Sequence, residues 1–168
     1  SVLIITELGT IEVELYAKKA PLTVKNFLRY VDGEFYEGGI FHRTVRLDNQ
    51  AGKTILIEVL QASINPEKQK EGFSPILLER TNKTGLRHKN GTISMARDTP
   101  DSGASDFFIC IGDQPSLDYG GKRNPDGQGF AAFGRVVKGM NVVKKIQMAP
   151  AEGQKLTPPV RILRIARK

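Results

Sequence analysis

The feature that most constrains the fold is a series of short apolar segments whose side chains alternate between two faces. Residues 2–6 and 11–15 alternate in this way, and Gly9 lies in the turn between them. A two-residue period is typical of half-buried strands, because successive strand side chains point to opposite faces. Further segments with strand character lie at 40–45, 55–60, 76–78, 92–96, 107–111, 130–137 and 160–165. So many short strands favour an all-β architecture.

Two segments have helical periodicity instead. Between Pro21 and Gly33, apolar residues recur at positions 24, 27, 28 and 31, the spacing of an amphipathic helix, and Thr23 is a candidate N-cap. Residues 139–147 have apolar side chains at 140, 143 and 146. One early and one late helix among many strands predict a closed β structure with helical covers.

Length and composition bound the possibilities without naming a function. The 168 residues fit one domain, and no apolar run reaches the roughly 20 residues that a membrane span needs. The net charge of +7 comes from scattered Lys and Arg that are not interleaved with aromatic residues. We therefore interpret it as a solvated basic surface and do not expect a nucleic-acid partner. The single cysteine, Cys110, lies in an apolar strand segment and is interpreted as a buried structural thiol.

The common catalytic motifs are missing from the sequence. Two histidines, His42 and His88, occur without HExxH or CxxC spacing, which argues against a zinc site. There is no GxSxG segment and no P-loop, and the Gly-rich residues 119–129 do not match GxGxxG. We therefore expect neither a cofactor nor a metal.

An ordered set of longer motifs is more informative. FHR at 41–43 is followed by Gln61, GTISMA at 91–96, SDFFI at 105–109, LD at 117–118 and FAAFGRV at 130–136. With GTIEVELY, PLTVKNFLRYV and GMNVVKKI, the chain resembles the cyclophilin family of peptidyl-prolyl cis–trans isomerases almost end to end. The resemblance implies a closed eight-stranded antiparallel β-barrel capped by two α-helices, with residues 1–168 as a single domain. It also implies isomerisation of X-Pro bonds in protein substrates, without a cofactor.

The resemblance assigns roles to individual residues. Arg43 matches the family's catalytic arginine, and Gln61 matches the glutamine that positions it. The remaining matches are substrate-binding positions. The proline pocket is formed by Phe108, Leu117 and Val59, and the strand edge that bonds the substrate main chain by Ala96 and Arg97.

Four positions depart from the family pattern near the pocket. Glu58 lies where the family often has phenylalanine, and we expect it beside Arg43, either orienting or engaging the guanidinium. Asp106 replaces a glutamine of the substrate groove. Phe130 replaces a histidine of many members, which keeps the pocket apolar. Ser116 lies where a tryptophan contributes to cyclosporin binding in sensitive members, so we predict weak cyclosporin affinity.

Strand alternation also separates core residues from groove residues. Phe107 and Phe108 must point to opposite faces of one strand, and we predict Phe107 in the barrel core and Phe108 in the groove. Met95 and Phe133 are predicted core residues. His42 is interpreted as a structural hydrogen-bonding residue.

Several questions stay open at this stage. Residues 44–55 and 119–129 are insertions relative to the family, and they either select substrates or decorate the surface. The same barrel could hold proline-containing segments with little turnover, or bind nucleic acid through its charge. The expected partners are unfolded or flexible proline-containing polypeptides, and we expect a monomer. The choice between bacterial cytoplasm and periplasm also stays open, because the chain begins at Ser1 and a cleaved leader would not be visible.

Overall fold

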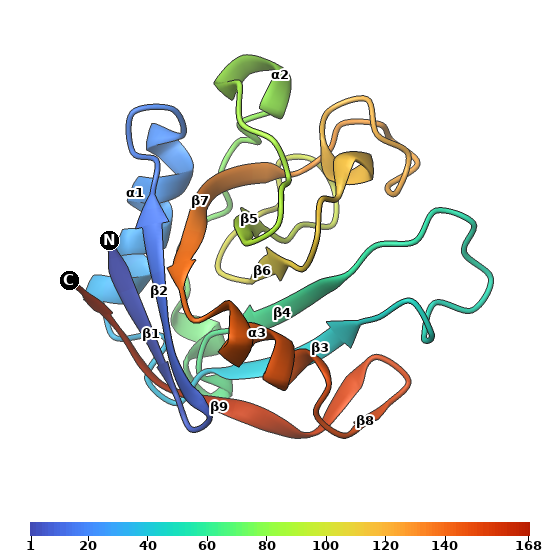
Figure 1. Ribbon diagram of the computed structural model, residues 1–168. Helices are drawn as coiled ribbons and strands as arrows, with labels where there is room; N and C mark the ends of the chain where they lie inside the picture. The colour runs from blue at the N-terminus through green and yellow to red at the C-terminus, as the bar shows by residue number, and fades with distance from the viewer.

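Eight antiparallel strands close into a barrel in the computed structural model, which describes residues 1–168 (Figure 1). The order around the barrel is β1-β2-β7-β5-β6-β4-β3-β9, and pairing of β1 with β9 closes it. The strands are β1 (Val2–Thr6), β2 (Gly9–Leu15), β3 (Ile40–Val45), β4 (Val59–Ser63), β5 (Thr92–Met95), β6 (Phe107–Cys110), β7 (Ala131–Lys138) and β9 (Lys155–Arg167). A two-residue strand, β8 (Ala151–Glu152), pairs only with β9. The expectation of a closed eight-stranded antiparallel barrel is confirmed.

The two termini lie side by side where the barrel closes (Figure 1). Val2 is opposite Arg167, and the backbone N–H of Lys168 donates to the carbonyl of Ser1 at 3.0 Å. Closure gives each of the eight strands a hydrogen-bonded neighbour on both sides, so the barrel has no open strand edge.

Two helices cover the barrel, as expected. Helix α1 (Pro21–Asp32) packs against β7 and β9, and α3 (Met140–Gln147) packs against β2, β3 and β4. The sequence patterns did not predict three shorter elements, which are α2 (Thr81–Thr84) and the 3-10 helices η1 (Pro66–Glu71) and η2 (Pro115–Leu117). Elements of three to six residues are too short to show a helical period.

Helix α1 begins differently from the expectation. Ala20 is the N-cap residue, so the prediction of Thr23 as the cap is wrong. The carboxylate of Glu79 instead accepts from the backbone N–H of Thr23 and from its hydroxyl, both at 2.6 Å. This acceptor lies 56 residues along the chain, so no local pattern could reveal it.

The core combines alternating barrel residues with one face of α1. The ring of Phe27 lies 5.6 Å from that of Phe107 and 5.2 Å from that of Phe133, centroid to centroid. Phe107, Phe133 and Met95 are all buried in this cluster, which confirms their predicted place in the core. None of the helices has the length and apolarity needed to cross a membrane.

Two predicted strand segments need correction. β4 begins at Val59, so residues 55–58 are not part of a strand. The side chain of Gln50 bonds both the N–H and the carbonyl of Ile57, and it thereby takes the place of a neighbouring strand. Residues 76–78 contribute only one isolated bridge, between Ile76 and Gly103.

Candidate active site

A groove of about 680 Å³ lies on the outer side of the barrel wall formed by β3, β4 and β6. Its floor is a second, smaller apolar cluster that is separate from the barrel core. The buried members are Val45, Ile57, Val59, Phe108, Cys110 and Leu117, with Ala96 and Phe130 packed against them. Phe108 faces this cluster while Phe107 faces the barrel interior, which confirms the predicted division between the two neighbouring aromatics.

Arg43 extends from β3 directly opposite Gln61 of β4. Its Nη1 donates to Oε1 of Gln61 at 3.0 Å, and its Nε donates to Oε1 of Gln154 at 2.9 Å. Its Nη2 donates to no protein acceptor. Burial lowers the pKa of Arg43, but a guanidinium stays charged in proteins. Because both partners are neutral amides, they orient the guanidinium of Arg43 but do not neutralise its positive charge.

A second layer of hydrogen bonds orients Gln61. Its Nε2 donates to Oδ2 of Asp106 at 3.0 Å, which leaves Oε1 facing Arg43. Nε2 of His42 lies 3.4 Å from the same Asp106 oxygen. Asp106 therefore lines the groove and anchors Gln61, and His42 has the structural role that we expected.

Glu58 does not lie beside Arg43, so that expectation is wrong. Its carboxylate accepts from Nε2 of Gln147 on α3 at 2.9 Å. Ile57 and Val59 line the groove instead, because neighbouring residues of an extended chain point to opposite sides. Sequence reasoning also missed Gln154, which lies 111 residues from Arg43 and carries no motif.

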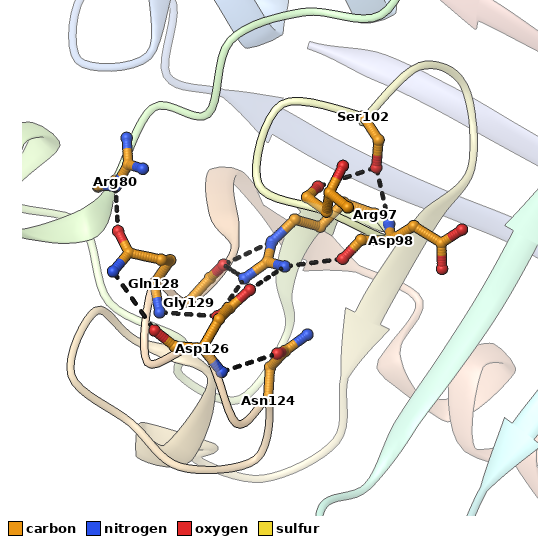
Figure 2. A network of polar contacts seen from close by, with 9 residues as sticks. Arg80, Arg97, Asp98, Ser102, Asn124, Asp126, Gln128 and Gly129 are labelled. Atoms are coloured by element: carbon orange, nitrogen blue, oxygen red, sulfur yellow. Dashed lines mark hydrogen bonds and ion pairs between the residues drawn. The ribbon is translucent and has the colours of Figure 1, made fainter.

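Arg97 was predicted to contact the substrate through its backbone, and its side chain has a separate set of structural contacts. Its side chain is only 1% exposed and makes a bidentate ion pair with Asp126, at 2.9 and 3.0 Å (Figure 2). It also donates to the carbonyls of Asp98 and Gly129. Its guanidinium carbon lies 4.6 Å from the ring centroid of Phe130. Arg97 thus joins the insertion at 119–129 to the wall of the groove.

The aromatic floor is held from both sides. Phe130 meets Phe108 edge to face, with centroids 5.5 Å apart. On the other side the ring of His88 stacks on Phe108 at 6.0 Å. Nδ1 of His88 lies 2.7 Å from Asp118, and Nε2 lies 2.8 Å from the hydroxyl of Ser94. Ser94 and His88 are fully buried, so this Ser-His-Asp chain is a support for the floor and not a nucleophile.

The two insertions contact each other through Arg123. Its Nη1 donates to Oε1 of Gln50 at 2.6 Å and to the carbonyl of Ile55 at 2.7 Å. Gly121 packs so closely on the backbone of Ser116 that a Cβ atom would clash. Ser116 itself does not line the groove. The two insertions are therefore joined through Arg123, and the residues of both that line the groove are called the insertion wall.

Comparison with known proteins agrees with this geometry. The family described as "Cyclophilin type peptidyl-prolyl cis-trans isomerase/CLD" matches residues 1–167. The chain belongs to the cyclophilin family. It is therefore an isomerase of X-Pro peptide bonds, and the family expected from the sequence is confirmed.

Curated bacterial members are its relatives over most of their length. The chain is 41% identical to "Peptidyl-prolyl cis-trans isomerase A" of Dickeya dadantii, over 90% of this chain and 73% of that protein. It is 38% identical to "Peptidyl-prolyl cis-trans isomerase B" of Escherichia coli, over 84% and 80% respectively. A crystal structure of a Cryptosporidium parvum cyclophilin, in the presence of the dipeptide Ala-Pro, has a TM-score of 0.75. The two share 21% identity, over 99% of this chain and 98% of the other, so this likeness supports the fold alone.

Proposed function

We propose that Arg43 catalyses rotation about the X-Pro bond by stabilising the twisted amide. The barrier of about 18–20 kcal/mol reflects the amide resonance that rotation breaks. In the twisted state the prolyl nitrogen becomes pyramidal and regains a lone pair, which a fixed donor stabilises over either planar state. The observation that supports this role is the oriented, uncompensated guanidinium of Arg43, whose Nη2 has no protein partner.

We further propose that the apolar floor holds the proline ring. Phe108, Leu117 and Val59 are buried beneath the groove, and Phe130 is packed against them. The backbone at Ala96 and Arg97 borders the same groove. The N–H of Ala96 donates to the carbonyl of Asp106 at 3.0 Å, so the carbonyl of Ala96 is the group proposed to bond an extended substrate segment. The proposed substrates are unfolded or flexible polypeptides that contain proline. Residues 1–168 would act as one monomeric domain, since the barrel has no open strand edge.

A protease-coupled proline-peptide assay tests the role of Arg43. Arg43→Ala should lower kcat/KM by about 10²-fold or more, the usual effect of removing a donor to transition-state charge. The Lys18→Gln variant removes an exposed charge outside the groove and is a control, with unchanged kcat/KM expected. Equal rates for wild type and Arg43→Ala would refute the proposed mechanism and favour a module that binds proline segments with little turnover.

Weak cyclosporin affinity is also proposed, because Ser116 offers no indole ring. The serine carbonyl instead accepts from the backbone N–H of Arg123 at 3.3 Å, so the insertion occupies this region. Calorimetric titration of wild type and Ser116→Trp should show tighter cyclosporin binding by the variant. A Ser116→Trp protein that binds no better than wild type would contradict the explanation.

A further inference from the structure

Three positive side chains line the same groove without a carboxylate partner. They are Arg43 on β3, Lys53 in the first insertion and Arg123 in the second. None of the three takes part in an ion pair. The fourth positive residue of the lining, Arg97, is neutralised by Asp126. The insertion side of the groove therefore carries positive charge that the protein itself leaves unbalanced.

Arg123 has the geometry of a binding residue with donors to spare. Nη1 is used by Gln50 and the carbonyl of Ile55, both neutral, while Nε and Nη2 donate to no protein acceptor. Burial, and then the nearby charge of Arg43, lower the pKa of Arg123. The guanidinium nevertheless remains charged. Two like charges that share a partly desolvated groove repel each other, and an anionic group placed between them would relieve that repulsion.

Neither of the two carboxylates that line the groove pairs with Arg123 or Lys53. Asp106 is engaged by Gln61 and His42, on the far side of Gln61 from Arg43. Asp98 lies on the segment after β5, and no hydrogen bond or ion pair joins it to Arg123 or Lys53. An acidic group of the ligand would therefore meet Arg123 and Lys53 without displacing an existing ion pair.

We propose that the groove prefers proline segments with an Asp or Glu side chain within two residues of the proline, and that Arg123 determines this preference. The acidic side chain would lie over the insertion wall, where Arg123 and Lys53 line the groove. A carboxylate matches the planar donor edge of a guanidinium. This inference rests on the proposed function, because it assigns a substrate class to the same groove.

The test compares matched peptides with blocked ends, so that no terminal carboxylate is present. Each pair carries Glu or Gln at one of the two positions before or after the proline. The measured quantity is the ratio of kcat/KM for the Glu peptide to that for the Gln peptide. For Glu on one flank of the proline, this ratio should be about 5 in low salt, the effect of a partly exposed ion pair. In about 0.5 M NaCl it should fall toward one, because salt screens the ion pair.

Variants of the insertion wall assign the effect. Arg123→Gln should bring the ratio close to one, Arg123→Lys should retain most of it, and Arg123→Glu should invert it. Lys53→Gln should lower the ratio, and the exposed side chain of Lys53 makes no hydrogen bond within the protein, so the substitution should leave the fold intact. The control variant Lys18→Gln, outside the groove, should keep the wild-type ratio.

Two results would overturn the inference. One is a wild-type ratio of one or less at all four positions. The other is a ratio that survives both Arg123→Gln and Lys53→Gln. Failure of the underlying function looks different, because wild type would then turn over neither the Glu nor the Gln peptides. If Arg123→Gln does not fold, the Lys53→Gln variant and the salt dependence of the wild-type ratio still test the preference for acidic residues.

Discussion

Replacing Arg97 with methionine removes the guanidinium that joins the second insertion to the barrel while keeping an apolar stem. The guanidinium is buried, and its loss removes the donor to the carbonyls of Gly129 and Asp98. The carboxylate of Asp126 then keeps only the backbone N–H of Gln128. Hydrogen bonds to charged groups contribute about 1.5–3 kcal/mol each. Asp126 is 31% exposed, and water can replace part of the loss, so we expect a net destabilisation of about 2–3 kcal/mol.

For a chain of 168 residues, this corresponds to a fall in Tm of about 4–12 °C. Thermal unfolding followed by circular dichroism measures it. Because Arg97 also packs on Phe130, we expect a fall in kcat/KM, roughly threefold to tenfold, from looser positioning of the aromatic wall. Asp126→Asn should lower Tm in the same direction, and the double variant should lose less than the sum of the two single effects.

The chain contains a matched control for this prediction. Arg167 pairs with Asp32 through two bonds of 2.8 Å, but both side chains are more than half exposed. Arg167→Met should therefore cost at most about 1 kcal/mol, the usual limit for a surface pair. The reasoning is refuted if Arg97→Met unfolds within about 2 °C of wild type, or if Arg167→Met is equally destabilising.

Two further predictions concern buried groups near the floor. Burial, and then the charges of Asp118 and Asp113, raise the pKa of the Cys110 thiol. It should therefore resist thiol reagents at neutral pH in the folded protein and react once urea unfolds it; rapid labelling of the native state would contradict this. For Asp118, burial acts to raise the pKa, but hydrogen bonds from His88 outweigh it and the pKa is lowered. Its carboxylate thus contributes stability that is fully present above the unfolded pKa of about 3.9 and is lost as the pH falls through the lowered folded pKa. Wild type should exceed Asp118→Asn in urea stability at pH 7, and the difference should shrink as the pH falls into the acid range. A difference that stays constant down to about pH 2 would contradict this.

The barrel and its division into core and groove could be predicted from the sequence, because both follow from alternation. Two-residue periodicity predicted the strands and placed Phe107 and Phe108 on opposite faces, and the resemblance then indicated that Phe108 faces the groove. It did not decide the environment of Glu58, which precedes β4 and turns toward Gln147 on α3. Strand character at 55–58 was misleading because Gln50 supplies hydrogen bonds that a neighbouring strand would otherwise make.

The surroundings of Arg43 were only half predictable. Gln61 lies on the neighbouring strand and belongs to a motif, so the resemblance brought it to Arg43. Gln154 comes from the turn between β8 and β9, more than 100 residues away, and an isolated glutamine in a turn carries no signal. The roles of Arg97 and Arg123 likewise depend on how the insertions fold back on the barrel, which periodicity does not describe.

The central claim is that Arg43 binds the twisted amide better than either planar form. Exchange NMR on one labelled Ala-Pro peptide reports the on-enzyme isomerisation rate and the ground-state Kd in the same sample. For Arg43→Ala we predict a rate lower by about 10²-fold or more, with Kd changed by less than about threefold. A Kd that rises in proportion to the loss of kcat/KM, with the on-enzyme rate unchanged, would contradict the account, because Arg43 would then only hold the substrate.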